Sequence, residues 1–291
     1  MKQVFLVILL AFGFVAGAQN KIVKKPKKQK PATTQVAPKK HKSQSKPTKG
    51  GTVKCVATKA SYSNGTLTVN GIKYNMVWVD GGTFRMGATS EQGSEISDEK
   101  PVHSVTLSGY YIGKTEVTQA LWQAVMGSNP SYFEGDDLPV EQVSWDDCQE
   151  FIRKLNSLTG QNFRLPTEAE WEFACRGGNN SRGYKYSGSN YIDNVAWYDG
   201  NSGDKTHPVA TKSPNELGIY DMSGNVWEWC ADWYGDYSSG RQTNPKGPYG
   251  GSGRVNRGGS WYNFARNCRS SIRIDDYPTY RDDLLGLRLA L

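Results

Sequence analysis

The sequence predicts an α+β fold with little regular secondary structure. Three short segments carry the apolar periodicity and the capping residues of helices, and together they cover only about forty of the 291 residues. The rest of the chain is rich in turn-forming and aromatic residues, with 32 Gly, 16 Tyr and 9 Trp. A body of this composition is expected to depend on aromatic packing and on many turns.

The three predicted helices have clear boundaries. The first spans residues 118–127, from a threonine cap to a glycine, and the second spans 144–160, from a serine cap to a glycine. The third spans 167–177 and begins with a capping box, in which Thr167 is followed three residues later by Glu170. Each helix carries apolar residues at the spacing of one buried face.

Strands are predicted ahead of the helices. Asn-Gly pairs at 64–65 and 70–71 join the segments 60–62, 66–69 and 74–79, and Asn-Gly favours the positive φ angles of a tight hairpin. Residues 52–75 are therefore expected to be an N-terminal hairpin region. This region is either a small accessory hairpin or the first strands of a main domain that covers 76–291.

Residues 1–18 are predicted to be a signal peptide. Lys2 is followed by an apolar run at 4–15 and by the small residues 16–18, which is typical of a cleavage site. The run is too short to span a bilayer comfortably. The protein is therefore expected to be exported and not transmembrane after cleavage, with the choice between periplasm, cell surface and secretion left open.

Residues 19–51 are predicted to be a disordered basic linker rich in Lys and Pro. Residues 1–50 carry 12 of the 35 basic residues and no acidic residue, so the remaining chain holds 23 basic and 28 acidic residues. The net charge of +7 therefore belongs to the N-terminal segment. A basic nucleic-acid-binding face on the folded body is not supported.

Eight sequence blocks occur in order along the body of the chain. They lie at residues 81–87, 99–103, 111–118, 139–145, 164–172, 224–229, 257–261 and 285–289. Their order and spacing resemble the formylglycine-generating enzyme family, also called sulfatase-modifying factors. The resemblance implies the variant of the C-type-lectin fold that this family adopts, whereas function must still be argued from the site.

The enzymes of this family use copper(I), and the resemblance implies that this chain keeps only one of their two copper-binding cysteines. The enzymes oxidise a sulfatase cysteine to formylglycine with Cu(I) held between two thiolates. Counting from Ser260, the first cysteine position is Asn263 and the second is Cys268. An amide is a poor ligand for Cu(I), which prefers sulfur. Copper is therefore not expected, and the chain is interpreted as a pseudoenzyme.

Five cysteines are present, and disulfides are permitted in an exported protein. The preferred pairing is a Cys230–Cys268 disulfide, while a redox-active free Cys268 or an inert buried thiol stays open. A second bridge between Cys148 and Cys175 is also open, which would leave Cys55 unpaired.

The resemblance also implies structural calcium. Carrying the family's ligands over gives the side chains of Asp221 and Glu228 and the carbonyls of Gly224 and Val226, oxygen donors on a bent loop of the kind that Ca²⁺ prefers. The alternative is that these acids cap turns and pair with arginines. A second set of ligands is less complete because its loop is short: Asn194, Val195, Asp204 and Thr206.

These observations favour a non-catalytic module that binds a protein or glycan ligand at the cell envelope or takes part in an envelope assembly. One alternative is a formylglycine-generating oxidase that acts on a sulfatase cysteine. Another is a lectin-fold binding protein diversified by a retroelement, because the last thirty residues resemble such variable regions. The residues expected to face a ligand are Tyr262, Asn263, Phe264, Ile272, Ile274 and Tyr280.

Overall fold

The computed structural model describes residues 58–93 and 97–291. The predicted signal peptide, the basic linker and Cys55 lie outside these residues. Within them the chain forms an α+β fold with three helices and several small sheets, as the sequence predicts.

The first sheet has the strand order β1-β2-β3-β6. Its strands are β1 Ala60–Ser63, β2 Thr66–Val69, β3 Ile72–Val79 and β6 Tyr110–Gly113. Both Asn-Gly turns adopt positive φ at the two central residues, with 49° and 75° at Asn64 and Gly65. The boundary expected between residues 75 and 76 falls inside β3, which pairs with β6. The hairpin region is therefore part of a larger sheet.

Two further sheets form the rest of the β-structure. The second, in the order β10-β9-β7-β11, contains β7 Trp227–Trp233, β9 Arg254–Arg257, β10 Arg273–Asp276 and β11 Leu285–Leu287. The third, in the order β4-β5-β8, contains β4 Gly82–Met86, β5 His103–Leu107 and β8 Gln242–Thr243. The pairs β7–β11 and β5–β8 are parallel, and both join segments that are far apart in the sequence.

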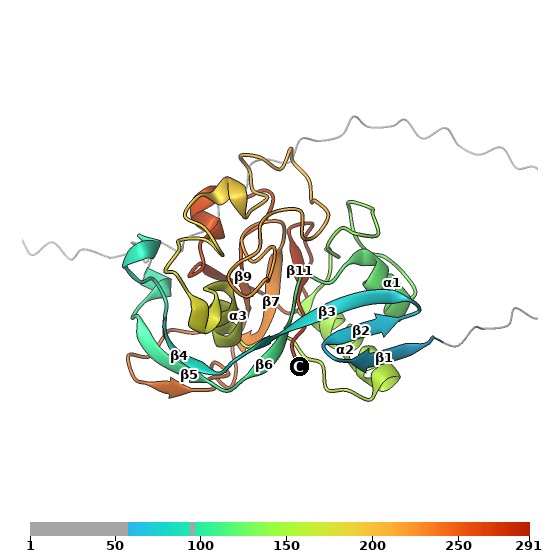
Figure 1. Ribbon diagram of the computed structural model, residues 1–291, viewed down its shortest axis with the longest axis horizontal. Helices are drawn as coiled ribbons and strands as arrows, with labels where there is room; N and C mark the ends of the chain where they lie inside the picture. The colour runs from blue at the N-terminus through green and yellow to red at the C-terminus, as the bar shows by residue number, and fades with distance from the viewer. Residues whose placement is uncertain (1–57, 94–96) are drawn as a thin grey trace, which may run out of the picture. The chain divides into compact units, whose positions relative to one another are not determined.

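The three predicted helices are confirmed. They are α1 Gln119–Met126, α2 Trp145–Thr159 and α3 Glu168–Cys175. The side chains of Thr118, Ser144 and Thr167 each accept a backbone N–H of the first turn, and the second and third caps are reciprocal capping boxes. Gly127 and Gly160 end the first two helices at positive φ. Figure 1 shows α1 and α2 beside the blue strands β1–β3, while α3 lies against β7 and β9.

The C-terminal segment connects the first two sheets. Beyond β11, Leu291 exchanges two backbone hydrogen bonds with Tyr111 of β6, at 3.1 and 3.0 Å, and the Leu287 carbonyl accepts the Val117 N–H at 2.9 Å. Because these bonds tie the end of the chain to residues that precede α1, the fold has many contacts between distant segments. Its stability therefore depends on the whole body and not on local elements.

The main core packs α3 between β4, β5 and β7. Its buried residues include Met86, Val105, Leu107, Trp171, Phe173, Met222, Cys230 and Val255. Large aromatic side chains are buried together with their polar atoms satisfied: the Trp171 indole donates to Glu228 at 2.7 Å and the Trp229 indole donates to the Val143 carbonyl at 3.0 Å. Aromatic packing is thus a main source of buried apolar area, as the composition predicts.

Buried arginine–carboxylate pairs cross this core. The pairs are Arg257–Glu172, Arg273–Glu168, Arg288–Glu228 and Arg269–Glu99, and every side chain in them is 6% exposed or less. Their members are separated by 60 to 170 residues in sequence. These four pairs, called the buried ion pairs below, therefore fasten α3, β7 and the segment before β5 to the C-terminal third of the chain.

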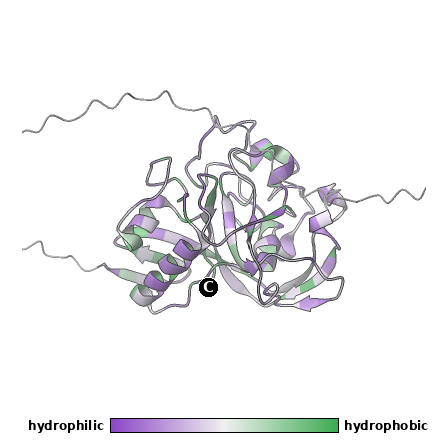
Figure 2. Cartoon of the chain, turned by 180° about the vertical axis from the view of Figure 1, so that it is seen from behind, coloured by the Kyte–Doolittle hydropathy of each residue, from purple (hydrophilic) through white to green (hydrophobic). Residues whose placement is uncertain are grey.

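No helix among the described residues is long and apolar enough to cross a membrane. Figure 2 shows hydrophilic and hydrophobic residues interspersed along the helices, as expected for helices with one buried face.

Breaking a buried ion pair is expected to destabilise the protein strongly. In Glu172→Gln, Arg257 and Arg176 each lose their nearest carboxylate, and only Glu168, at 3.8 Å, stays near Arg257. The change should lower the free energy of unfolding by about 3–5 kcal/mol. The matched control is Glu150→Gln, which breaks a pair with Arg153 whose side chains are 41% and 68% exposed and should leave the free energy of unfolding nearly unchanged. Urea unfolding measures both, and equal losses would contradict the role assigned to the buried pairs.

Candidate functional site

The loop after β9 carries the position that corresponds to the copper site. It begins with Gly258 and Gly259, both at positive φ, at 100° and 80°. A Cβ atom on Gly259 would lie 2.4 Å from the Asn267 carbonyl oxygen and 2.8 Å from the Cys268 sulfur. Only glycine fits there, so the loop folds back closely on itself and brings Cys268 against its own beginning.

Asn263 is a structural amide in this loop. It is 3% exposed, and its side-chain oxygen accepts hydrogen bonds from the Trp227 indole at 2.7 Å and from the Ser260 hydroxyl at 2.7 Å. A carbonyl oxygen has two lone pairs, and both are used here. The side chain is therefore fixed by its neighbours, with its oxygen fully occupied as an acceptor.

Cys268 is a buried thiol in an apolar setting. It is fully buried and packs against Tyr186 and Val195. Burial raises the pKa of the Cys268 thiol to about 12, and a backbone hydrogen bond at Ser260 opposes this only in part. Burial therefore disfavours the free thiolate, which is the nucleophilic form of the side chain.

The predicted disulfides are not formed. The structure gives Cys148, Cys175, Cys230 and Cys268 as free, buried thiols. Cys230 belongs to the main core on β7, while Cys268 belongs to the separate apolar cluster around Tyr186. A disulfide needs Cβ atoms about 4 Å apart, so two cysteines packed in different clusters cannot be bridged without moving the backbone.

The predicted calcium loop contains one carboxyl group that fits a cation. Asp221 is 3% exposed, and its backbone has φ of 60°. Its carboxylate accepts the Ala210 N–H at 2.7 Å. Burial raises the pKa of Asp221 to about 6, and the neighbouring Glu228 carboxylate adds to the rise, while Arg288 opposes it. A negative charge in this position is destabilised, which is the setting in which a bound cation helps.

The other predicted side-chain ligand is already engaged. Glu228 forms an ion pair with Arg288 at 2.7 Å and accepts the Trp171 indole N–H at 2.7 Å. Among the described residues, no three His, Cys, Asp or Glu side chains converge as a metal-binding group. The loop therefore fits calcium only in part: Asp221 and the carbonyls of Gly224 and Val226 remain as donors, whereas Glu228 neutralises an arginine.

Sequence reasoning missed Glu116 in this region. Its carboxylate accepts the Asn225 side-chain N–H at 2.8 Å and the Val226 backbone N–H at 3.1 Å. Burial raises its pKa well above the ordinary value, and Asp221 and Glu228 raise it further. Glu116 lies in the sequence block 111–118 that carries the family resemblance, and its place in that block was the available signal.

The residues of the second predicted calcium set have different surroundings, and the second site stays a prediction. Asn194 ends a short 3₁₀ helix, and its carbonyl accepts the Ser213 N–H at 2.9 Å. Val195 is buried in the cluster around Cys268, and Asp204 lies on an exposed turn. The Thr206 hydroxyl is buried with no hydrogen-bond partner among the described residues. These positions give no further support to a second site.

The predicted ligand-facing set divides into two groups. Phe264 is 44% exposed, and Tyr262, Ile274 and Tyr280 are partly exposed. Asn263 and Ile272 are each 3% exposed, so the expectation that they face a ligand is wrong. Both are buried because the loop and β10 turn these side chains inward, where Asn263 meets Trp227.

Glu141 is a further buried carboxyl that sequence reasoning missed. One oxygen accepts the Phe133 N–H at 2.8 Å, and the other is buried without a partner among the described residues. Burial raises the pKa of Glu141 to about 7, and the carboxylates of Asp282 and Asp283 contribute to the rise. Phe133 connects Glu141 to the C-terminal segment. Its N–H donates to Glu141, and its ring centroid lies 5.3 Å from that of Trp261.

The fold and the comparisons define the class of protein. The α+β body with its C-terminal segment has the C-type-lectin-like architecture found in formylglycine-generating enzymes. A family model described as "Sulfatase-modifying factor enzyme 1-like domain" matches residues 67–291. The chain belongs to this family.

Similar proteins carry different names. The chain is 37% identical over 262 residues to "Chaperone protein LppX" of Paenibacillus barcinonensis, covering 73% of this chain and 86% of that one. It is 30% identical over 285 residues to the formylglycine-generating enzyme of Mus musculus, covering 74% of each. Among solved structures, Treponema denticola variable protein 1 superposes with a TM-score of 0.70 at 38% identity, covering 77% of this chain and 97% of that chain.

The raised pKa of Glu141 predicts a pH-dependent stability. A carboxyl whose pKa is higher in the folded state stabilises the fold below pH 4.5, and this contribution is lost as pH rises through 7. Glu141→Gln should therefore flatten the fall in unfolding free energy between pH 5 and 8, by on the order of 2 kcal/mol. Asp232 and Asp221 also have raised pKa values, but both are present in the variant and in the native protein. The difference between the two plots of unfolding free energy against pH therefore reports Glu141 alone.

The control for this experiment is Glu134→Gln, a change on an exposed side chain of the same loop. It should leave the slope unchanged in urea titrations at each pH. An identical slope in Glu141→Gln and native protein would contradict the assignment.

Proposed function

We propose that this protein is an exported, non-catalytic binding module of the sulfatase-modifying-factor family. The observation that carries the proposal is the hydrogen bonding of Asn263, whose side-chain oxygen is fully used by Trp227 and Ser260 at the position of a copper-binding cysteine. Cys268, at the other copper position, is a single buried thiol. One sulfur beside an occupied amide does not make the two-thiolate site that Cu(I) chemistry in this family needs.

The partner is proposed to be a protein or glycan at the cell envelope. The predicted signal peptide at residues 1–18 supports export. The similar proteins named a chaperone and a variable protein support a role in recognition, because neither name describes oxidation of a substrate. The partly exposed aromatic residues Tyr262, Phe264 and Tyr280 supply a contact surface near the C-terminal end.

Two alternatives have distinct signatures. A formylglycine-generating oxidase is favoured by the 30% identity to the mouse enzyme and would require a copper-independent route. A retroelement-diversified binding protein is favoured by the likeness to the Treponema denticola variable protein. A neighbouring reverse transcriptase with a template repeat of the C-terminal segment would establish the latter.

The native protein is expected to produce no aldehyde. Purified protein loaded with Cu(I) is incubated with a Cys-x-Pro-x-Arg peptide, and mass spectrometry reports conversion to formylglycine. The Asn263→Cys variant is assayed in parallel, because the substitution restores a cysteine at the family's other copper-binding position. Aldehyde formed by the native protein would contradict the non-catalytic assignment, whereas activity in the variant alone would locate the loss of chemistry at residue 263.

We also propose that calcium binds the loop of Asp221. The support is the buried carboxyl group of Asp221 beside Glu116, two acids whose pKa values are raised first by burial and then by neighbouring carboxylates. The main-chain carbonyls of Gly224 and Val226 lie on the same loop and would complete an oxygen-rich set. Calcium here would be structural, since it would neutralise acids inside the fold.

Removing calcium is expected to lower the melting temperature. An ion that binds only the folded state stabilises it by mass action, by about 2.7 kcal/mol at a hundredfold excess over its dissociation constant. For a body of this size the loss corresponds to a fall of about 5–10 °C. Calorimetry in calcium and in excess EGTA measures it, with Asp221→Asn as the variant that should lose the response. Identical melting curves in both buffers would refute the site.

A further inference from the structure

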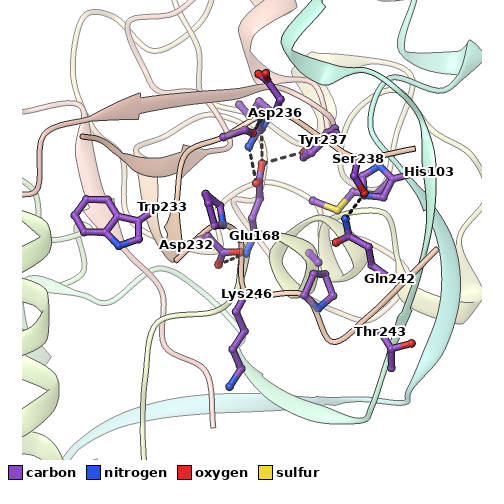
Figure 3. Close-up of a pocket in the computed structure, with 17 residues that line it drawn as sticks. His103, Glu168, Asp232, Trp233, Asp236, Tyr237, Ser238, Gln242, Thr243 and Lys246 are labelled. Carbon is purple, nitrogen blue, oxygen red and sulfur yellow. Dashed lines mark hydrogen bonds and ion pairs between the residues drawn. The ribbon is translucent and has the colours of Figure 1, made fainter. Parts of the chain in front are cut away.

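A cavity of about 550 Å³ lies away from the loop of Asn263 and Cys268. It is bounded by the start of α3, the end of β7 and the segment 235–248 (Figure 3). Its polar lining includes His103, Glu168, Asp232, Gln242 and Arg273. Neither the copper positions nor the calcium loop contributes to it, so the proposed function leaves this cavity unexplained.

The arginine in this cavity is not available to bind an anion. Arg273 pairs with Glu168 through two hydrogen bonds, at 2.7 and 2.8 Å. Its remaining terminal nitrogen donates to the carbonyls of Asp98 and Gly235, at 3.2 and 2.9 Å. Because the guanidinium is engaged on all of its nitrogens and its charge is balanced by Glu168, a phosphate or carboxylate ligand would find no donor there.

Asp232 is a buried carboxyl group in this cavity, and it takes part in no side-chain pair as close as that of Arg273 with Glu168, although Arg254 and Arg273 interact with it electrostatically. One of its oxygens accepts the Glu168 N–H at 2.9 Å, and the carboxyl group, 4% exposed, lines the cavity. Burial raises the pKa of Asp232 to about 7, and the neighbouring Glu168 carboxylate adds to the rise. Figure 3 shows Asp232 beside the base of Glu168, with Lys246 extending away from both. The site thus favours a ligand that brings a positive charge.

The remaining walls suit an aliphatic or saturated-ring skeleton. Met86, Ala169, Pro245 and Pro248 line the cavity. The Trp233 ring is covered by the Arg254 guanidinium at 3.5 Å. The Tyr237 ring is likewise contacted by Arg273 and by the His103 ring. Since these aromatic faces are already occupied, ring stacking contributes less than ion pairing and contact with the prolines.

We propose that this cavity binds a primary amine, whose ammonium group pairs with Asp232 and whose carbon skeleton lies against Pro245 and Pro248. Two sources share this chemistry, an amino sugar and a lysine side chain. The proposal goes beyond the proposed function and does not depend on it, since it involves neither Asn263 nor the loop of Asp221.

The test is calorimetric titration of the full-length protein at pH 8 with two matched pairs of probes. Glucosamine is compared with N-acetylglucosamine, and Nα-acetyl-lysine methylamide with its Nε-acetylated form. Acetylation removes the charge while keeping the skeleton, so the free amine of at least one pair should bind tenfold or more tightly than its acetylated partner. The pair that shows the difference identifies the source. Equal binding within both pairs overturns the proposal. So does the absence of binding by either amine at about 10 mM, a generous upper bound for a weak site.

Asp232→Asn is the decisive variant, because its amide oxygen can still accept the Glu168 N–H while the charge is removed. It should lose amine binding by tenfold or more, with an unchanged far-UV spectrum showing that it is folded. The matched control is Asp193→Asn, an exposed acid outside the cavity lining, which should bind the amine like the native protein. Equal losses in both variants would mean a diffuse charge effect and would overturn the site. If Asp232→Asn is unfolded, Lys246→Gln on the exposed rim is the second test, because it removes a positive charge from the cavity lining. It should strengthen amine binding, and unchanged or weaker binding counts against the proposal.

Discussion

Burial of charged pairs is the constraint on which this structure depends. A body with three short helices and small sheets leaves long stretches of irregular chain, whose backbone cannot be fixed by helices or sheets alone. Arg257–Glu172 joins β9 to α3, and Arg288–Glu228 joins the residue after β11 to β7, with all four side chains fully buried. These pairs therefore hold the short elements that flank the irregular stretches. An ion pair of this kind adds little net stability over apolar packing, but an unpaired member is very costly. Only the arrangement that satisfies every member is therefore tolerated.

The buried ion pairs also border the loop that carries Asn263 and Cys268. Arg257, the last residue of β9, pairs with Glu172 of α3, and Arg269, directly after Cys268, pairs with Glu99. Between these anchors the side-chain oxygen of Asn263 accepts hydrogen bonds from Trp227 and Ser260, so the asparagine contributes to the packing of the loop.

The sequence was most informative where local chemistry decides the structure. The helix boundaries at Thr118, Ser144 and Thr167 are confirmed because a capping side chain bonds the N–H groups of its own first turn. The Asn-Gly hairpins are confirmed for the same reason: few other residues accept positive φ. The eight sequence blocks predicted the fold itself, because their order and spacing along residues 81–289 resemble those of one family.

Long-range packing is what the residues alone could not supply. The Cys230–Cys268 disulfide was wrong because spacing along the chain does not show that the two thiols pack in different clusters. Ile272 was expected to face a ligand, yet it lies directly before β10 with its side chain only 3% exposed. Asp232 gave no signal in sequence, since its raised pKa arises from burial beside Glu168, 64 residues away.

The central claim is that the asparagine at residue 263 leaves Cys268 as a single thiol that cannot hold copper(I) tightly. The most direct measurement is competition for Cu(I) between the native protein and the chromogenic chelator bicinchoninate under anaerobic conditions. The account predicts that the chelator's absorbance stays constant as protein is added. Withdrawal of one copper per chain, with sulfur ligation seen by X-ray absorption, would contradict it.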